Sequence, residues 1–276
     1  SQLKPFLESI ETFHLLNLCW KNIVTNPSAE MMLKIRKSQR AAQYLQLLQT
    51  SVKALGRFLA VILEIEPTGG FFQSIFLNQS VITDNMWERK RALQVFFHLL
   101  SACENLQRGH TCEHFGFLVG LLAPLTCDPM PTSRLLAASC LSSLLRIQAK
   151  ATNSVMEMGD IGSLCVGLNS CSTVSQLQAS SKIARMVCRN FALEGTTDFL
   201  MAIKQTLQQV TGTRLRAAGK WMITFLQMYG KDICQDVPFI LYTLRCSMSM
   251  QQSMFVPFLC HALTILTCCH PEVTID

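Results

Sequence analysis

The sequence predicts an all-α fold, an α-solenoid of stacked antiparallel helix pairs. Three observations lead to this prediction. Apolar residues recur at three- and four-residue spacing over long stretches, as on one face of a helix. Runs that alternate apolar and polar residues, as in strands, are scarce. Turn signals recur instead, as in "EPTGG" at 66–70, "CDPMP" at 127–131 and "DVP" at 236–238.

The composition is that of a globular protein. Of 276 residues, 49% are hydrophobic and 15% are charged, which excludes a disordered chain. The longest apolar stretch, "SVKALGRFLAVILEIEP", is interrupted by Lys53, Arg57 and Glu64, so it does not predict a membrane span. The first residues lack the layout of a signal peptide. The chain starts without Met and ends at "HPEVTID", so we expect a segment of a longer protein.

Thirteen cysteines are present, but no C-x-x-C pair occurs. Cysteines such as Cys140, Cys165 and Cys188 stand among apolar residues in helical patterns, which is typical of buried thiols. We therefore expect a reducing compartment, the cytoplasm. The net charge of +6 is mildly basic and is no nucleic-acid footprint unless the cations cluster on one face.

One pattern repeats along the chain. It is a small, a large and a large apolar residue at i, i+4 and i+8, which form one buried stripe on a helix. The alanine anchors are 45, 42 and 38 residues apart, with a fainter copy at Ala41. The copies are Ala92, Phe96 and Leu100; Ala137, Leu141 and Leu145; Ala179, Ile183 and Val187; and Ala217, Trp221 and Phe225.

Helix pairs at a period of about 40 to 47 residues are the signature of HEAT or armadillo repeats. Each unit would hold an outer helix, a turn and the anchored inner helix. The stretches "HFGFLVGLLAPL", "VMEMGDIGSLCVGL" and "TTDFLMAIKQTLQQV" supply three outer helices. We predict a single array over 1–276, with N-terminal helices in 1–68 and repeat units at 69–110, 111–152, 153–193, 194–230 and 231–270.

Two stretches, "WERKRALQVFFHLL" (87–100) and "FGFLVGLLAPLTCDPMPTSRLLAASCLSSLLRIQ" (115–148), resemble the maestro heat-like repeat family. The second, in which "GLLAPLTCDP" leads into an arginine and an alanine pair, is the more specific. The resemblance implies a long HEAT array without a known catalytic site. The repeat at 171–189 departs from the pattern because Gln176 replaces the arginine, so equivalent polar contacts should weaken there.

Arginines recur three residues before the anchors, at Arg89, Arg134 and Arg214. One interpretation lines them along the concave surface, where acidic peptides or phosphates bind. The other directs each arginine into the turn between helices, where Asp128 or its counterpart accepts a hydrogen bond. We name these three as candidate partner-binding residues; burial against turn carbonyls or Asp128 would contradict that.

A second candidate partner surface is the basic cluster "KIRKSQR", with Lys34, Arg36, Lys37 and Arg40. Such a stripe could bind an acidic protein or membrane phosphates. A solvated helix face would carry the same residues. No aromatic residues interleave with it, which argues against stacking on single-stranded nucleic acid.

Metal and catalytic motifs are weak. "HTCEH" (110–114) groups two histidines, a cysteine and a glutamate, but the HExxH pattern of a catalytic zinc is absent and a capped helix start explains the residues. "CCH" (268–270) suggests a helix terminus. No P-loop, dinucleotide fingerprint, nucleophile elbow or kinase signature occurs. We expect no enzyme activity, no cofactor and no metal.

The sequence thus predicts a non-catalytic HEAT-repeat scaffold for protein–protein interactions, with protein partners of unknown identity. No small-molecule substrate is expected. The alternative function is a peripheral adaptor that binds acidic membrane or nucleic-acid surfaces through its basic stripes, although we expect neither as the main partner.

Overall fold

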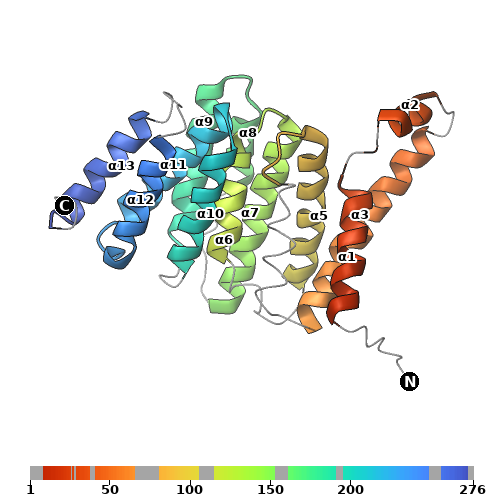
Figure 1. Cartoon of the computed structure of the whole chain (residues 1–276), viewed down its shortest axis with the longest axis horizontal. Coiled ribbons are helices and arrows are strands. Elements are labelled where there is room, and N and C mark those ends of the chain that lie inside the picture. The colour runs from red at the N-terminus through yellow and green to blue at the C-terminus, as the bar shows by residue number, and fades with distance from the viewer. Residues whose placement is uncertain are drawn as a thin grey trace. The chain divides into compact units, whose positions relative to one another are not determined.

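The computed structural model describes residues 9–25, 27, 29–37, 41–65, 81–105, 115–152, 161–190, 195–248 and 256–272. The chain divides into two compact units, unit 1 (Ser1–Asn105) and unit 2 (Leu106–Asp276). Every regular element in these ranges is a helix, and helices of each unit lie against one another (Figure 1). The predicted all-α class, built from stacked helix pairs, is confirmed.

Unit 1 is built around a long helix. Its elements are α1 (Ser9–Ile23), α2 (Ala29–Lys37), α3 (Ala41–Ile65) and α5 (Met86–Asn105). Helix α3 packs along α5, and the two backbones approach closely at Gly56. A Cβ atom there would lie 2.7 Å from the Cβ of His98, so only glycine fits. Trp20 of α1 meets Phe96 of α5 edge to face, with ring centroids 6.1 Å apart.

Unit 2 alternates short and long helices. Its elements are α6 (Phe115–Leu122), the 3₁₀ turn η2 (Ala123–Cys127), α7 (Pro131–Thr152), α8 (Ile161–Asn169), α9 (Thr173–Cys188), α10 (Thr196–Gln209), α11 (Gly212–Tyr229), η4 (Cys234–Asp236), α12 (Val237–Met248) and α13 (Val256–Cys269). No helix among the described residues has both the length and the apolar character needed to cross a membrane.

The apolar stripe is buried in the four full copies, whereas the fainter copy predicted at Ala41 is wrong, because Ala41 is only half-buried and Leu45, four residues later, is exposed. The anchors Ala92, Ala137, Ala179 and Ala217, and the large residues four and eight positions later, all belong to the core. A further copy that the sequence analysis missed lies in α13. Ala262 follows Ala217 by 45 residues and Leu266 follows Ala262 by four, and both are fully buried. In the missed copy Leu259 stands where the other copies have an arginine or Gln176.

The helices of unit 2 do not pack in simple sequence order. Helix α6 lies along α10, whereas α8 packs on α7 and α9. Two glycines make the α6–α10 contact close. A Cβ on Gly120 would lie 2.5 Å from the Cβ of Ala202, and a Cβ on Gly116 would overlap the carbonyl oxygen of Gly195. The outer helices predicted in "HFGFLVGLLAPL" and "TTDFLMAIKQTLQQV" are therefore direct neighbours. Of "VMEMGDIGSLCVGL", only residues 161–168 fall in the described part.

Candidate functional site

A recurring polar contact closes the turn before three of the anchored helices. In each, the side chain three residues before the alanine anchor donates a hydrogen bond to the carbonyl oxygen six residues earlier in the chain. The pairs are Arg89 Nη1 to Thr83 O (2.7 Å), Arg134 Nη1 to Asp128 O (2.8 Å) and Gln176 Nε2 to Ser170 O (2.6 Å). We call this the turn contact. It satisfies a buried or half-buried backbone acceptor that the helix itself cannot reach.

The residue that supplies the carbonyl has a second role in the same turn. Its side-chain oxygen accepts a hydrogen bond from the backbone N–H two residues later, at the residue that caps the helix. The bonds are Asn85 N to Thr83 Oγ1 (3.2 Å), Met130 N to Asp128 Oδ1 (2.8 Å) and Ser172 N to Ser170 Oγ (3.1 Å). Thr, Asp and Ser are short oxygen-bearing residues that favour such local bonds. The turn contact and this bond together fix the angle at which the chain enters each inner helix.

The turn contact settles where the candidate arginines lie. Arg89 and Arg134 are only 1% and 4% exposed, and Arg134 Nε also donates to Leu168 O at 2.6 Å. Arg214 is buried at the equivalent stripe position. The structure therefore contradicts the expectation that Arg89, Arg134 and Arg214 line a partner surface, because none presents its guanidinium to solvent. Arg134 donates to the backbone oxygen of Asp128, as the turn interpretation expected for this residue.

The contact expected to weaken at Gln176 is retained. Gln176 is buried and reaches the carbonyl of Ser170 at the same six-residue separation. The substitution removes the positive charge and keeps one hydrogen bond, whereas Arg134 donates to three carbonyls, so the weakening of the polar contacts at this repeat stays a prediction.

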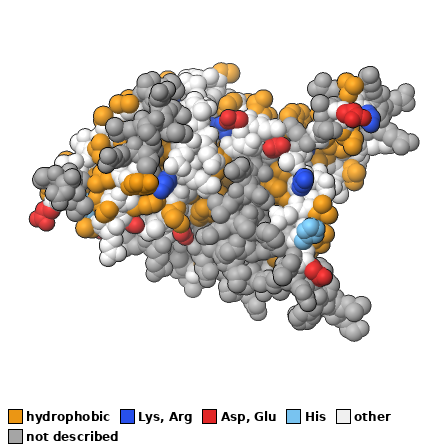
Figure 2. All heavy atoms as spheres, viewed as in Figure 1, with side chains coloured by type: hydrophobic (Ala, Val, Ile, Leu, Met, Phe, Trp, Pro, Cys, Tyr) orange, Lys and Arg blue, Asp and Glu red, His pale blue; other side chains and the backbone are white. Residues whose placement is uncertain are grey.

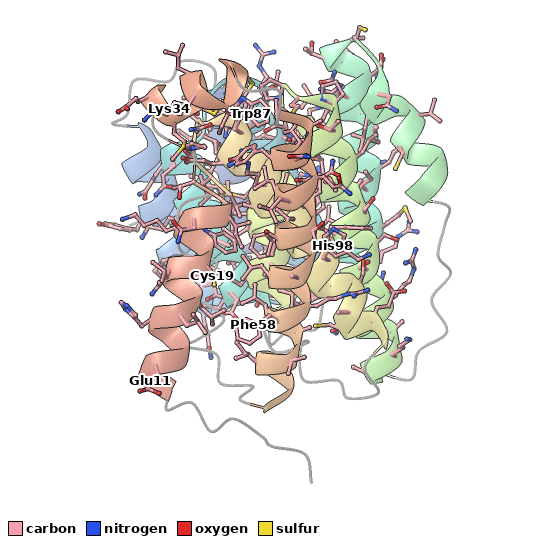
Figure 3. All side chains as sticks on the ribbon, turned by 90° about the vertical axis from the view of Figure 1, so that its right-hand side faces the viewer. Glu11, Cys19, Lys34, Phe58, Trp87 and His98 are labelled. Atoms are coloured by element: carbon pink, nitrogen blue, oxygen red, sulfur yellow. The ribbon has the colours of Figure 1, made fainter. Side chains whose placement is uncertain are left out.

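The predicted basic stripe is described only in part. Lys34 is exposed and pairs with Glu30 one helical turn earlier, at 2.7 Å. It projects from α2 at the end of unit 1 opposite Glu11 (Figure 3). Arg40 and the side chains of Arg36 and Lys37 lie outside the described residues, so the stripe stays a prediction. An exposed pair such as Glu30–Lys34 contributes little to stability.

The predicted metal and terminus motifs have different outcomes. Residues 110–114, "HTCEH", lie outside the described residues. Within the described ranges, no three or more His, Cys, Asp or Glu side chains gather as metal ligands would. Cys268 and Cys269 end α13, and His270 Nε2 hydrogen-bonds the backbone oxygen of Gly230, so "CCH" is a helix terminus as predicted.

A buried chain of hydrogen bonds connects three elements of unit 2. Trp221 Nε1 on α11 donates to Ser180 Oγ on α9 at 2.9 Å. Thr126 Oγ1 in η2 lies 2.7 Å from Ser180 Oγ and donates to Ala123 O at 2.6 Å. Since the Thr126 proton is used, the Ser180 hydroxyl donates to Thr126. Sequence reasoning missed this chain because Ser180 and Trp221 are 41 residues apart.

Arg91 is a second polar residue whose role the sequence did not reveal. It is buried on α5, and its Nη1 donates to Thr25 O at 3.2 Å and to Ile23 O at 3.5 Å. These carbonyls lie at the C-terminal end of α1, where backbone acceptors lack helical partners. The guanidinium also lies 5.7 Å from the ring centroid of the half-exposed Trp87.

The cysteines whose side chains are described are free thiols. Burial raises the pKa of Cys127 to about 11, despite hydrogen bonds with Ser180 and Thr126 and two nearby cations, and raises that of Cys188 to about 12. Burial likewise raises the pKa of Cys140. These thiols are protonated near neutral pH and behave as small core residues, not as nucleophiles.

The exposed surface carries mixed charge and scattered apolar residues. On the face shown in Figure 2, Lys and Arg side chains stand singly with acidic side chains among them. On unit 1, the exposed side of α3 holds Leu47, Phe58 and Val61, which share one helical face (Phe58 is labelled in Figure 3). Phe58 and Val61 are neighbours on this face, whereas Leu47 lies about 16 Å away along the helix, so the three residues do not form one contiguous patch.

Comparison of the sequence with known proteins also indicates a HEAT-repeat protein. The model of the family "Maestro, HEAT repeats" matches residues 87–275. Maestro heat-like repeat-containing protein family member 2A from Homo sapiens is 26% identical over 253 residues, which cover 87% of this chain and 14% of that protein. The Mus musculus protein of the same name is 25% identical over 254 residues, with the same coverage. The chain thus spans a small part of these relatives. No solved structure matches it. With its anchored inner helices, its turn contacts and the family match over most of its length, the chain belongs to the Maestro HEAT-repeat family.

Proposed function

We propose that the chain is a non-catalytic scaffold that binds protein partners on the exposed sides of its inner helices. The observation that carries this proposal is the buried stripe. In α9 the alanine anchor and the residues four and eight positions later are all buried, whereas Gln178, Lys182 and Arg185 on the opposite side are exposed. Helix α11 is buried over most of its length and reaches solvent partly at Arg216 and Lys220 and fully at Gln227. Arrays of such helices present an extended surface, and their binding sites lie on it.

The polar residues of the described part support the same proposal. Arg89, Arg134 and Gln176 are used in turns, Ser180 and Thr126 in the buried hydrogen-bond chain, and the buried thiols are protonated. Each of these groups is explained by packing of the helices. The relatives' names specify HEAT-like repeats and no reaction. The cytoplasm remains our proposed compartment, on the grounds of cysteine spacing.

Photo-crosslinking in cells tests the scaffold. A photoreactive amino acid would replace Gln178 on α9 or Gln227 on α11, which are exposed on the inner helices, and Gln208 on α10 as the comparison site. We expect discrete protein adducts from the two inner positions, and fewer or different adducts from Gln208. Adducts to lipid or nucleic acid alone would favour the peripheral adaptor. The absence of protein adducts at all three positions would overturn the scaffold.

A further inference from the structure

The inner helices of unit 2 contain no acidic residue. Every Asp and Glu between residues 106 and 276 lies outside α7, α9, α11 and α13. Lysines and arginines are nevertheless frequent in α9 and α11. The charged residues of these four inner helices, which we call the inner layer, are therefore all positive. Because these helices hold cations and no Asp or Glu, no ion pair forms between their own residues, which favours a positive potential on their exposed sides.

Five cations of this layer are placed by the repeat itself. Helices α9 and α11 pack against each other and are aligned by Ala179 and Ala217. Lys182 and Lys220 stand three residues after these anchors, and Arg216 stands one residue before the second. Arg185 follows Lys182 on the same helical face, and Arg189 caps the C-terminal end of α9. We call these five residues the basic face: Lys182, Arg185, Arg189, Arg216 and Lys220.

The basic face is accessible. Lys182, Arg185 and Arg189 are exposed, and Arg216 and Lys220 are half-buried, whereas the stripe residues Ile183 and Val187 on the other side of α9 are fully buried. The half-buried Lys220 contrasts with the buried arginine of the same helix, Arg214, which lies on the stripe side. The face therefore offers several solvent-reaching donors from two adjacent helices.

We propose that the basic face binds an acidic polypeptide segment, which is a proposal that rests on the scaffold function above. Carboxylates match the Lys and Arg donors in charge and geometry. Aromatic rings for stacking on bases are missing from the face, since α9 has no aromatic residue and Trp221 and Phe225 of α11 are buried. Large apolar side chains that would enter a bilayer are also missing between Lys182 and Arg189 on the exposed side.

The size of the face sets the length of the probe. From Lys182 to Arg189, α9 rises about 10 Å, and the neighbouring helix axis is about 8 to 10 Å away. An extended segment of about four residues spans this diagonal. A fluorescein-labelled peptide of about twelve residues, rich in Glu, therefore covers the face, and the same peptide with Gln for Glu is its uncharged control.

The test measures binding of these peptides to the whole 276-residue chain by fluorescence anisotropy, at about 0.15 M salt. The face variant is Lys182→Gln/Arg185→Gln/Lys220→Gln. The matched variant, Lys21→Gln/Lys53→Gln/Lys231→Gln, removes the same charge from exposed sites elsewhere. We expect the face variant to bind the Glu peptide about tenfold more weakly, which corresponds to a modest energy for each exposed pair. The matched variant should change affinity less than about twofold.

Equal weakening in both variants would overturn the proposal, because it would show that only net charge matters. Tighter binding to a DNA duplex or to anionic vesicles than to the Glu peptide would overturn it in favour of the other ligand class. Circular dichroism verifies folding, and Lys182→Met/Lys220→Met, which keeps the apolar stems, is the second variant. If protein adducts form at Gln178 while the face variant binds the Glu peptide normally, the scaffold stands and only the basic face fails.

Discussion

Trp221 Nε1 on α11 lies 2.9 Å from Ser180 Oγ on α9 and donates a hydrogen bond to it in the core of unit 2. Ser180 follows the alanine anchor of its own helix by one residue, and Trp221 follows the next anchor by four. The large stripe residue of one repeat is therefore bound to the hydroxyl of the preceding repeat. The same side chain, Trp221, thus fills the core and makes a hydrogen bond between two repeats.

The first prediction concerns that hydroxyl. Ser180→Ala leaves the buried Trp221 indole N–H without its acceptor, and we expect the free energy of unfolding to fall by about 1 to 3 kcal/mol. The control is Ser181→Ala, because Ser181 is half-buried and its hydroxyl bonds only within its own helix, to Leu177 O. Urea unfolding of both variants measures the difference. Equal losses in the two variants would show that the interhelical bond contributes nothing.

The second prediction concerns the α6–α10 contact. Gly120→Ala adds a Cβ that would lie 2.5 Å from the Cβ of Ala202, so the helices must separate. We expect the free energy of unfolding to fall by about 1 to 2 kcal/mol, since the cost of overpacking is larger than the gain from the better helix propensity of alanine. The double variant Gly120→Ala/Ala202→Gly restores the space and should recover part of the loss. A strictly additive cycle would contradict direct contact between these residues.

The third prediction uses the natural glutamine of the 171–189 repeat. Arg134→Gln should cost less stability than Arg134→Met, because Gln176 already reaches the carbonyl six residues earlier. In Arg134→Met the carbonyls of Asp128 and Leu168 lose their donor. Each buried acceptor without a partner lowers the free energy of unfolding by about 1 to 3 kcal/mol. Thermal unfolding of the two variants gives their order. A methionine variant as stable as the parent would show that the turn contact does not contribute to stability.

The fourth prediction is a pH dependence of unit 1. Burial lowers the pKa of His98, and the nearby cations Lys53 and Arg57 lower it further, below the ordinary value of 6.5. The unfolded chain therefore binds a proton first as the pH falls, and folding stability decreases below about pH 6.5 until the folded state also protonates. Chemical unfolding at pH about 7.5 and 5.5 measures this loss.

The controls for that dependence are two substitutions. His98→Gln removes the titrating group and should lose less stability between the two pH values than the parent does. Lys53→Gln removes one of the cations and should give an intermediate loss. If all three proteins respond to pH alike, then His98 does not control the stability of unit 1 in this range.

The sequence was informative about which side of a helix is buried, and less so about what covers that side. Periodicity at Ala137, Leu141 and Leu145 depends only on local geometry, so the stripe could be predicted residue by residue. That Gly120 meets Ala202 depends on how helices far apart in the chain pack, and a glycine in a helix gives only a weak signal of close approach.

The candidate site was harder to predict for a physical reason. A recurring arginine fits a binding surface and a buried turn equally well, because a guanidinium serves carboxylates and backbone carbonyls alike. The signal that could have separated them is the short oxygen-bearing residue six positions earlier, seen in Thr83, Asp128 and Ser170. Its recurrence indicates a turn, since partner recognition does not require it.

The direct contact of α6 with α10 determines where unit 2 can be shortened. In an ideal repeat array each pair touches only its neighbours, so pairs can be removed from one end and the rest remains folded. Here the surface of α6 is covered by a helix about 80 residues further along the chain, which closes a long loop at an entropic cost. Deleting α10 and everything after it therefore exposes the apolar residues of α6 near the opposite end of the unit. Residues 115–209 form the shortest block that keeps this surface covered, and a truncated protein should extend at least to Gln209.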